Sequence, residues 1–151
     1  MYAVDASPTA VEYVTGQARQ HNIDIQTKIA EMTHIPFENN TFDYLSAWNV
    51  IYHGDLAVVL RSLSEILRVL KPGGLFQGTM LSKRNAEIET ATPIAKDTYI
   101  NHDRFEKRHP HFYCHAADLI AILNGFEPLI LKDVEHRRKG SYHWHFLAEK
   151  L

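Results

Sequence analysis

The chain has 151 residues, of which 45% are hydrophobic and 23% are charged, a composition typical of one globular domain with a buried core. This composition excludes a disordered tail or a fibre. The formal net charge of −2 gives no general electrostatic case for nucleic acid or an anionic membrane. No apolar run approaches the roughly 18 to 20 residues of a membrane helix, and the first residues do not resemble a signal peptide. We therefore expect a soluble, cytoplasmic protein.

Strand and helix patterns alternate along the chain without a linker or a repeat, which predicts a single domain over residues 1–151. A short strand is expected over Tyr2–Asp5, followed by a helix with Ser7 as its N-cap. Alternating apolar residues predict a second strand over Ile23–Ile29, and Phe42–Val50 has the pattern of a third.

The strongest helix pattern lies in the middle of the chain. Leucine, isoleucine and valine recur at helical spacing over Asp55–Leu70, and Lys71–Gly74 should end that helix in a turn. A strand is expected over Leu75–Met80. Residues 83–115 are polar and mixed in pattern, so we interpret them as an insertion on the substrate side.

The last third of the chain predicts a helix over Ala116–Leu123 and strands over Phe126–Val134 and Tyr142–Ala148. Two strands joined by so short a turn must be antiparallel, because a parallel return needs a crossover of about a dozen residues. The predicted fold class is therefore α/β, with a mostly parallel sheet that ends in an antiparallel hairpin.

Polar side chains follow three successive predicted strands. Asp5 ends the first strand, Glu31 follows the second, and Asn49 and His53 lie at the end of the third. Ligands of open α/β sheets bind at this edge, and a carboxylate there can accept hydrogen bonds from the two hydroxyls of a ribose. The simpler alternative is that Asp5 only forms an Asx turn into the helix that follows.

These strand ends, together with LKPGG at residues 70–74 and the terminal hairpin, resemble the class I methyltransferases that use S-adenosylmethionine. The resemblance covers essentially the whole chain. It implies a Rossmann-like fold with helices on both faces of the sheet and S-adenosylmethionine as the cofactor. A nicotinamide dehydrogenase is the competing interpretation, and the LKPGG turn and the hairpin favour the methyltransferase.

The resemblance also implies roles for individual residues in binding the cofactor. Asp5 would hold the ribose hydroxyls, and Ala6 would line the adenine side. Glu31 would lie near the adenine amino group, and Met32 would flank the ring. Asn49 would lie where the backbone approaches the methionine part.

One part of the family pattern is missing from this sequence. Family members begin with a strand and a glycine-rich loop about 20 residues before the ribose acid, whereas here Met1 stands four positions before Asp5. The expected fold is therefore an amino-terminally truncated one. Either the chain is a fragment of a longer product, or a second copy completes the sheet, and we expect a homodimer because exposed strand edges and apolar faces favour association.

Histidines are the other candidates for chemistry. The run from His109 to His115 contains three imidazoles and one thiol, but its spacing is not that of a structural zinc site, so we expect no metal. The resemblance implies that His111 and Tyr113 face the substrate. His53 is a candidate general base, because imidazole titrates near neutral pH.

Two further histidine segments have simpler interpretations. His143 and His145 share one face of the last strand and are either bases or half-exposed packing residues, and packing is the preferred interpretation. The basic run at residues 136–139 is interpreted as a solvated turn.

The sequence thus favours S-adenosylmethionine-dependent methyl transfer to a small-molecule acceptor, with no role for nucleic acid or membrane as a partner. The alternative is a non-catalytic truncated domain that acts as a dimeric binding or scaffold protein, since half of the cofactor cradle is missing. Methyl transfer depends largely on positioning, so it needs a catalytic base only when the acceptor arrives protonated.

Overall fold

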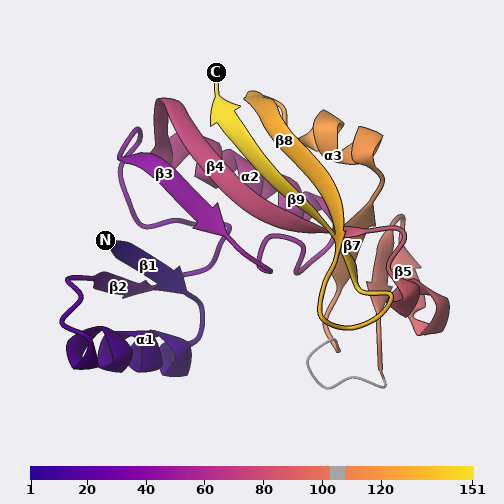
Figure 1. The fold of residues 1–151 in the computed structure, drawn as a ribbon, viewed down its shortest axis with the longest axis horizontal. Coiled ribbons are helices and arrows are strands. Elements are labelled where there is room, and N and C mark those ends of the chain that lie inside the picture. The colour runs from indigo at the N-terminus through magenta and orange to yellow at the C-terminus, as the bar shows by residue number, and fades with distance from the viewer. Residues whose placement is uncertain (103–107) are drawn as a thin grey trace.

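The computed structural model describes residues 1–102 and 108–151. The expected insertion at 83–115 therefore includes five residues, 103–107, that lie outside the described part. Figure 1 shows the arrangement of the helices and strands. In chain order they are β1 (Tyr2–Asp5), α1 (Pro8–Gln20), β2 (Gln26–Ile29), β3 (Phe42–Ala47), α2 (Leu56–Val69), β4 (Leu70–Ser82), the 3₁₀ helix η1 (Ala86–Thr90), β5 (Thr92–Ala95), β6 (Thr98–Ile100), β7 (His111–Cys114), α3 (Ala116–Ile122), β8 (Phe126–Glu135) and β9 (Tyr142–Lys150).

The amino-terminal elements form a small unit of their own. Strands β1 and β2 pair in parallel, with Tyr2 opposite Gln26 and Asp5 opposite Ile29, and α1 packs beside them. Three rings, those of Tyr2, Phe37 and Phe42, meet edge to face with centroids 5.0 to 5.5 Å apart. Since Phe42 begins β3, these rings join the small unit to the main sheet.

The main sheet is centred on β4. Strand β4 pairs in parallel with β3 and, at its carboxyl end, with β7, and it pairs antiparallel with β9. Strands β8 and β9 form the expected carboxyl-terminal antiparallel hairpin, and β5 and β6 continue the sheet beyond β7. The Rossmann-like α/β fold is confirmed, although the pairing is more mixed than a mostly parallel sheet.

Helix α2 forms where the sequence predicts it. Asp55 caps its amino end, because its side chain accepts a hydrogen bond from the Val58 backbone N–H at 2.9 Å. The side chains of Val59, Leu63 and Ile66 lie on one face of α2 and are buried in the core. This burial explains why the helical period of the sequence is so regular here.

The turn expected at residues 71–74 is present as a bulge inside β4. Strand β4 begins at Leu70, immediately after α2, but Leu70 lies opposite Phe42 and Leu75 opposite Tyr44, so the four residues between them have no partner on β3. Gly73 has a φ of 74°, and a Cβ on Gly74 would lie 2.8 Å from the Lys71 carbonyl oxygen. The two glycines therefore allow the backbone to bulge and reverse between two positions that pair with β3.

Gly78 lies in the middle of β4 against the core. A Cβ at this position would come within 2.5 Å of the Phe146 ring, so we expect Gly78→Ala to destabilise the protein by about 1–2 kcal/mol. Gly16→Ala is the matched control, because it adds the same methyl group in α1, where no atom lies within 4 Å, and should stabilise by about 0.5–1 kcal/mol. Urea unfolding of both variants measures the difference. Equal effects of the same sign would contradict the packing shown here.

The core joins α2, α3 and the central strands. Its buried residues include Phe76 and Met80 of β4, Tyr113 of β7, Leu119 of α3 and Phe146 of β9. Within the described ranges, no helix combines the length and apolarity needed to cross a bilayer.

Candidate functional site

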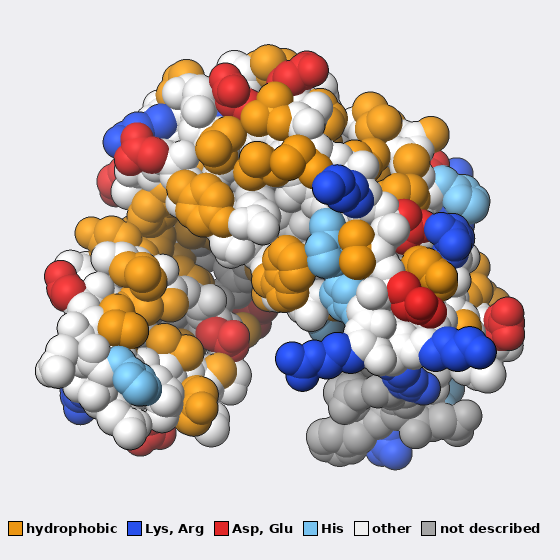
Figure 2. All heavy atoms as spheres, viewed as in Figure 1, with side chains coloured by type: hydrophobic (Ala, Val, Ile, Leu, Met, Phe, Trp, Pro, Cys, Tyr) orange, Lys and Arg blue, Asp and Glu red, His pale blue; other side chains and the backbone are white. Residues whose placement is uncertain are grey.

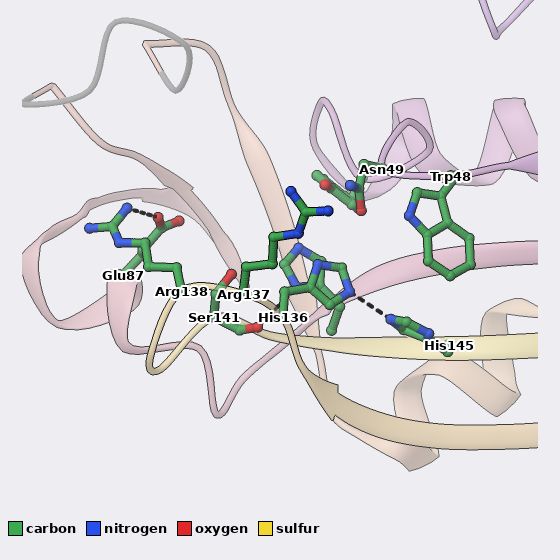
Figure 3. Close-up of a pocket in the computed structure, with 10 residues that line it drawn as sticks. Trp48, Asn49, Glu87, His136, Arg137, Arg138, Ser141 and His145 are labelled. Atoms are coloured by element: carbon green, nitrogen blue, oxygen red, sulfur yellow. Dashed lines mark hydrogen bonds and ion pairs between the residues drawn. The ribbon is translucent and has the colours of Figure 1, made fainter.

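A cleft of about 640 Å³ opens where β3 ends and β9 begins. Figure 3 shows that its lining comes from three parts of the chain: the segment after β3, the 3₁₀ helix η1, and the loop and strand of the terminal hairpin. The lining residues are Trp48, Asn49, Tyr52, Glu87, His136, Arg137, Arg138, Ser141, His143 and His145. The cleft therefore lies at the carboxyl edge of β3, where the ligand sites of open α/β sheets are found.

Asn49 forms the sharp corner that ends β3. Its φ is 57°, a left-handed conformation that asparagine tolerates, and its backbone N–H donates to the Thr79 hydroxyl at 2.7 Å. The same hydroxyl donates to the Asn49 side-chain oxygen at 3.2 Å. Thr79 lies fully buried in β4, so the central strand fixes this corner of the cleft.

Three imidazoles form one wall of the cleft. The Nε2 atoms of His136 and His145 are 2.6 Å apart, and the His136 and His143 rings stack with centroids at 3.9 Å. The indole of Trp48 meets the His145 ring edge to face at 4.6 Å. His143 and His145 therefore line the cleft, whereas the sequence favoured simple packing for them.

The basic run at 136–139 is not merely a solvated turn. His136, Arg137 and Arg138 all line the cleft, and the Arg138 guanidinium pairs with the Glu87 carboxylate at 3.0 Å. Sequence reasoning missed this role because it depends on the tertiary position of the hairpin, whose strand β9 pairs with β4. The signal that could have found it is the hairpin itself, which brings the residues after β8 beside the start of β9.

Burial sets the charge of this wall. It lowers the pKa of His136 and of His145, and the neighbouring His136 lowers the pKa of His145 further. Burial, with a smaller contribution from the Glu87 charge, raises the pKa of the Tyr52 hydroxyl. Near pH 7 we therefore expect His136 and His145 to be neutral, and a neutral imidazole can accept a proton.

The lowered pKa values predict a pH-dependent stability. The unfolded chain binds protons to these imidazoles more readily than the folded one, so their contribution is full well above the usual pKa of 6.5 and is lost as the pH falls below it. The melting temperature should therefore fall between about pH 8 and about pH 5.5, and less steeply in His145→Asn. His21→Asn, which changes an exposed histidine after α1, is the control. The prediction would be contradicted if the melting temperature changed equally with pH in the wild type, His145→Asn and His21→Asn.

The residues expected to bind the adenosine part lie together at the edge of the small unit. Asp5 is exposed at the end of β1, and its carbonyl accepts a hydrogen bond from Ala30, just after β2, at 3.1 Å. Ala6 and Glu31 are exposed as well, and Met32 is half-buried. Asp5 Oδ1 also accepts from the Ser7 N–H at 2.8 Å, so the Asx turn weighed for this residue is present.

The three candidate catalytic residues lie outside the lining of the cleft. Tyr113 is buried in the core and packs edge to face against Tyr99 at 5.5 Å. His53 and His111 come together with His109 in a cluster next to two residues of the cleft lining, since the Tyr52 ring lies near both and His53 contacts the Asn49 carbonyl. The cleft offers His136, His143 and His145 in their place.

Figure 2 shows a wide hollow between the small amino-terminal unit and the rest of the molecule. Large apolar side chains are exposed in and near these elements, among them Ile29, Tyr44 and Trp48, each between 45% and 58% exposed. In the described residues, β1 pairs with β2 and β3 pairs with β4, so the two sheets do not share hydrogen bonds.

Comparison with known proteins shows similarity to methyltransferases. Residues 1–74 match the model of a family described as a methyltransferase domain. A stretch of 47 residues, 30% of this chain, is 49% identical to the sterol 24-C-methyltransferase erg6 of Schizosaccharomyces pombe. The stretch spans 12% of the length of that enzyme.

Solved structures share the fold over nearly the whole chain. An S-adenosylmethionine-dependent methyltransferase from Methanosarcina mazei superposes with a TM-score of 0.82 at 17% identity, covering 99% of this chain and 81% of its own. A 1,6-didemethyltoxoflavin-N1-methyltransferase from Burkholderia thailandensis, with bound S-adenosylhomocysteine, has a TM-score of 0.71 at 14% identity. The superposition covers 99% of this chain and 70% of that enzyme. Residues 1–74 are thus similar to a methyltransferase domain, and nearly the whole chain has the fold of S-adenosylmethionine-dependent methyltransferases of known structure.

Proposed function

We propose that this chain transfers a methyl group from S-adenosylmethionine to a small-molecule acceptor bound in the cleft. The observation that supports this most directly is the position of the cleft, which begins at Trp48 and Asn49, the residues that follow β3. The family resemblance assigns Asn49 to the methionine part of the cofactor. An acceptor in the cleft would then lie beside the methyl group.

The arrangement of the strand ends fits the cofactor. Parallel pairing of β1 with β2 brings Asp5 opposite Ile29, two residues before Glu31, so both acids lie at one edge. Asp5 would hold the ribose hydroxyls, and Ala6, Glu31 and Met32 would surround the adenine. Bound S-adenosylmethionine supplies a methyl carbon attached to a positively charged sulfur. The remaining catalytic requirement is a positioned acceptor that can lose its proton.

The cleft wall suits an acceptor with an aromatic ring and an ionisable oxygen or nitrogen. The indole of Trp48 and the stacked rings of His136 and His143 provide flat surfaces, and Arg137 provides a positive charge. A neutral imidazole, His145 or His136, would accept the proton that a hydroxyl or amine loses as it attacks the methyl carbon. No metal is needed for this step.

Methyl transfer from labelled S-adenosylmethionine to a panel of phenols and heteroaromatic amines tests the proposal. We expect labelled product with at least one acceptor, and a lower kcat in His145→Phe with little change in the binding of S-adenosylhomocysteine. His21→Phe is the matched control, because this exposed histidine lies after α1. Absence of S-adenosylhomocysteine binding up to millimolar concentration would contradict the proposal and favour a non-catalytic binding or scaffold domain.

The proposal includes a homodimer. Tyr2, Ile29 and Tyr44, on β1, β2 and β3, are each about half exposed, and large apolar side chains exposed together often mark a contact surface. A second copy that packs against these strands would cover them. Light scattering at micromolar concentration tests this part, and a monomeric mass would contradict it.

A further inference from the structure

We propose that His53, His109 and His111 form a binding site for a divalent transition-metal cation of the Zn²⁺ type. One nitrogen of each imidazole lies within 4.8 Å of the others. The site joins two distant parts of the sequence, since His53 follows β3, whereas His109 and His111 lie just before and at the start of β7. None of the three is a residue proposed above for the cofactor or the acceptor, although His53 contacts one of those residues, Asn49.

The backbone holds two of the ligands in place. His53 and His111 face each other across an isolated antiparallel bridge. Hydrogen bonds flank this bridge, from the Phe112 N–H to the Tyr52 carbonyl at 2.9 Å and from the Gly54 N–H to the Pro110 carbonyl at 2.8 Å. The His53 and His111 imidazoles therefore project from a hydrogen-bonded backbone that positions them close together.

Neighbouring carbonyl groups fix the tautomers of these two ligands. A carbonyl oxygen can only accept, so His53 Nε2, 3.0 Å from the Asn49 oxygen, must carry a proton. His111 Nδ1, 2.8 Å from the His109 oxygen, must carry one for the same reason. The lone pairs then lie on His53 Nδ1 and His111 Nε2, and a carbonyl behind each ring is the arrangement that orients metal-binding histidines in proteins.

The third ligand completes the set. His109 Nε2 lies 2.6 Å from His53 Nδ1. A metal ion with bonds of about 2.0–2.1 Å to both would hold them about 3.3 Å apart, which a small movement of the exposed His109 side chain provides. Without metal, His109 Nε2 must donate its proton to the His53 Nδ1 lone pair, so binding through Nε2 also requires the His109 proton to move to Nδ1.

The donor set determines the class of cation. Three neutral imidazoles suit Zn²⁺, Cu²⁺, Ni²⁺ and Co²⁺, whereas Mg²⁺ and Ca²⁺ require oxygen ligands. Three protein ligands leave a fourth position for water. His53 also contacts the Asn49 carbonyl, so an ion bound to His53 and His111 would link the segment after β3, which lines the cleft, to β7.

Calorimetric titration with Zn²⁺ tests the site, with a chelator-treated protein that carries no histidine tag. We expect one equivalent to bind with micromolar or tighter affinity. His109→Ala should weaken binding by about 10- to 100-fold or more, and this exposed residue can be replaced without disturbing the core. His53→Gln should weaken it similarly and gives a second, independent variant.

His136→Asn is the control, because it changes the other histidine cluster, and it should retain the one-equivalent site. Co²⁺ should give the strong visible absorption of a four-coordinate ion in the wild type and lose it in His109→Ala. The proposal is overturned if Zn²⁺ does not bind at millimolar concentration. It is equally overturned if His109→Ala and His53→Gln bind like the wild type, or if binding is lost only in His136→Asn.

Discussion

We expect Asp5→Ala to weaken the binding of S-adenosylhomocysteine by about 1–3 kcal/mol, roughly 5- to 150-fold in Kd, because it removes hydrogen bonds between a charged group and the ribose. Asp5 is suited to this role because it is exposed at the carboxyl end of β1, beside the residues that follow β2. Isothermal calorimetry of the variant against the wild type provides the measurement.

Asp5 also accepts the Ser7 N–H at the start of α1, so a structural effect must be separated from a loss of ligand contacts. Asp5→Asn retains a side-chain oxygen for Ser7 and removes the charge, and it should lose affinity while its melting temperature stays near that of the wild type. Asp24→Asn is the matched control, since Asp24 precedes β2 and lies at the opposite edge of the same parallel pair. Unchanged affinity in Asp5→Ala would reject the assignment of Asp5.

Periodic segments were predictable because burial enforces their pattern. Helix α2 lies within one residue of the range predicted from its apolar face, and the strands of the terminal hairpin differ from prediction only at their ends. The reversal at Gly73 and Gly74 was predictable from the turn chemistry, but its place inside β4 was not. The pairing of Leu70 with Phe42, ahead of the bulge, is a tertiary effect that local sequence does not encode.

Residues 83–115 were not predictable as elements, because η1, β5 and β6 are short and every residue of β5 is exposed. The same limit applies to the sites. The strand-end residues Asp5 and Asn49 could be selected because the parallel topology collects strand ends. His53 meets His109 and His111 only through the bridge to β7, so metal-ligand spacing within the sequence could not reveal the cluster.

We expect Arg68→Met to destabilise the protein by about 2–4 kcal/mol, which lowers the melting temperature by roughly 5–15 °C in a chain of this size. The Arg68 guanidinium donates to the carbonyls of Ile35 and Phe37, to the Asn39 side chain, and to both oxygens of Glu65. The Glu65 carboxylate in turn accepts the Ile35 N–H at 2.8 Å.

This network ties α2 to the segment after β2, whose Phe37 belongs to the ring cluster that joins the small unit to the main sheet. Removing the guanidinium leaves two carbonyls without this donor and a partly buried carboxylate without its cation. Arg61→Met is the control, because Arg61 is exposed on the same helix, and it should change stability by no more than about 0.5 kcal/mol. Equal melting temperatures for the two variants would contradict the role of Arg68.

Glu65 gives the same network a pH dependence. Its pKa is lowered from 4.5 to about 2, chiefly by the hydrogen bond from Arg68, with burial opposing the shift and the Ile35 N–H adding to it. The folded protein therefore favours the ionised form, so the stabilisation is full above the unfolded pKa of 4.5 and is lost as the pH falls towards 2. Urea unfolding between about pH 6 and about pH 3 should show a steeper loss of stability in the wild type than in Glu65→Gln, because the variant cannot titrate at this position. If the two proteins lose stability in parallel, Glu65 is not ionised in a stabilising pair, and the link from α2 must rest on the hydrogen bonds that Arg68 donates to the Ile35 and Phe37 carbonyls.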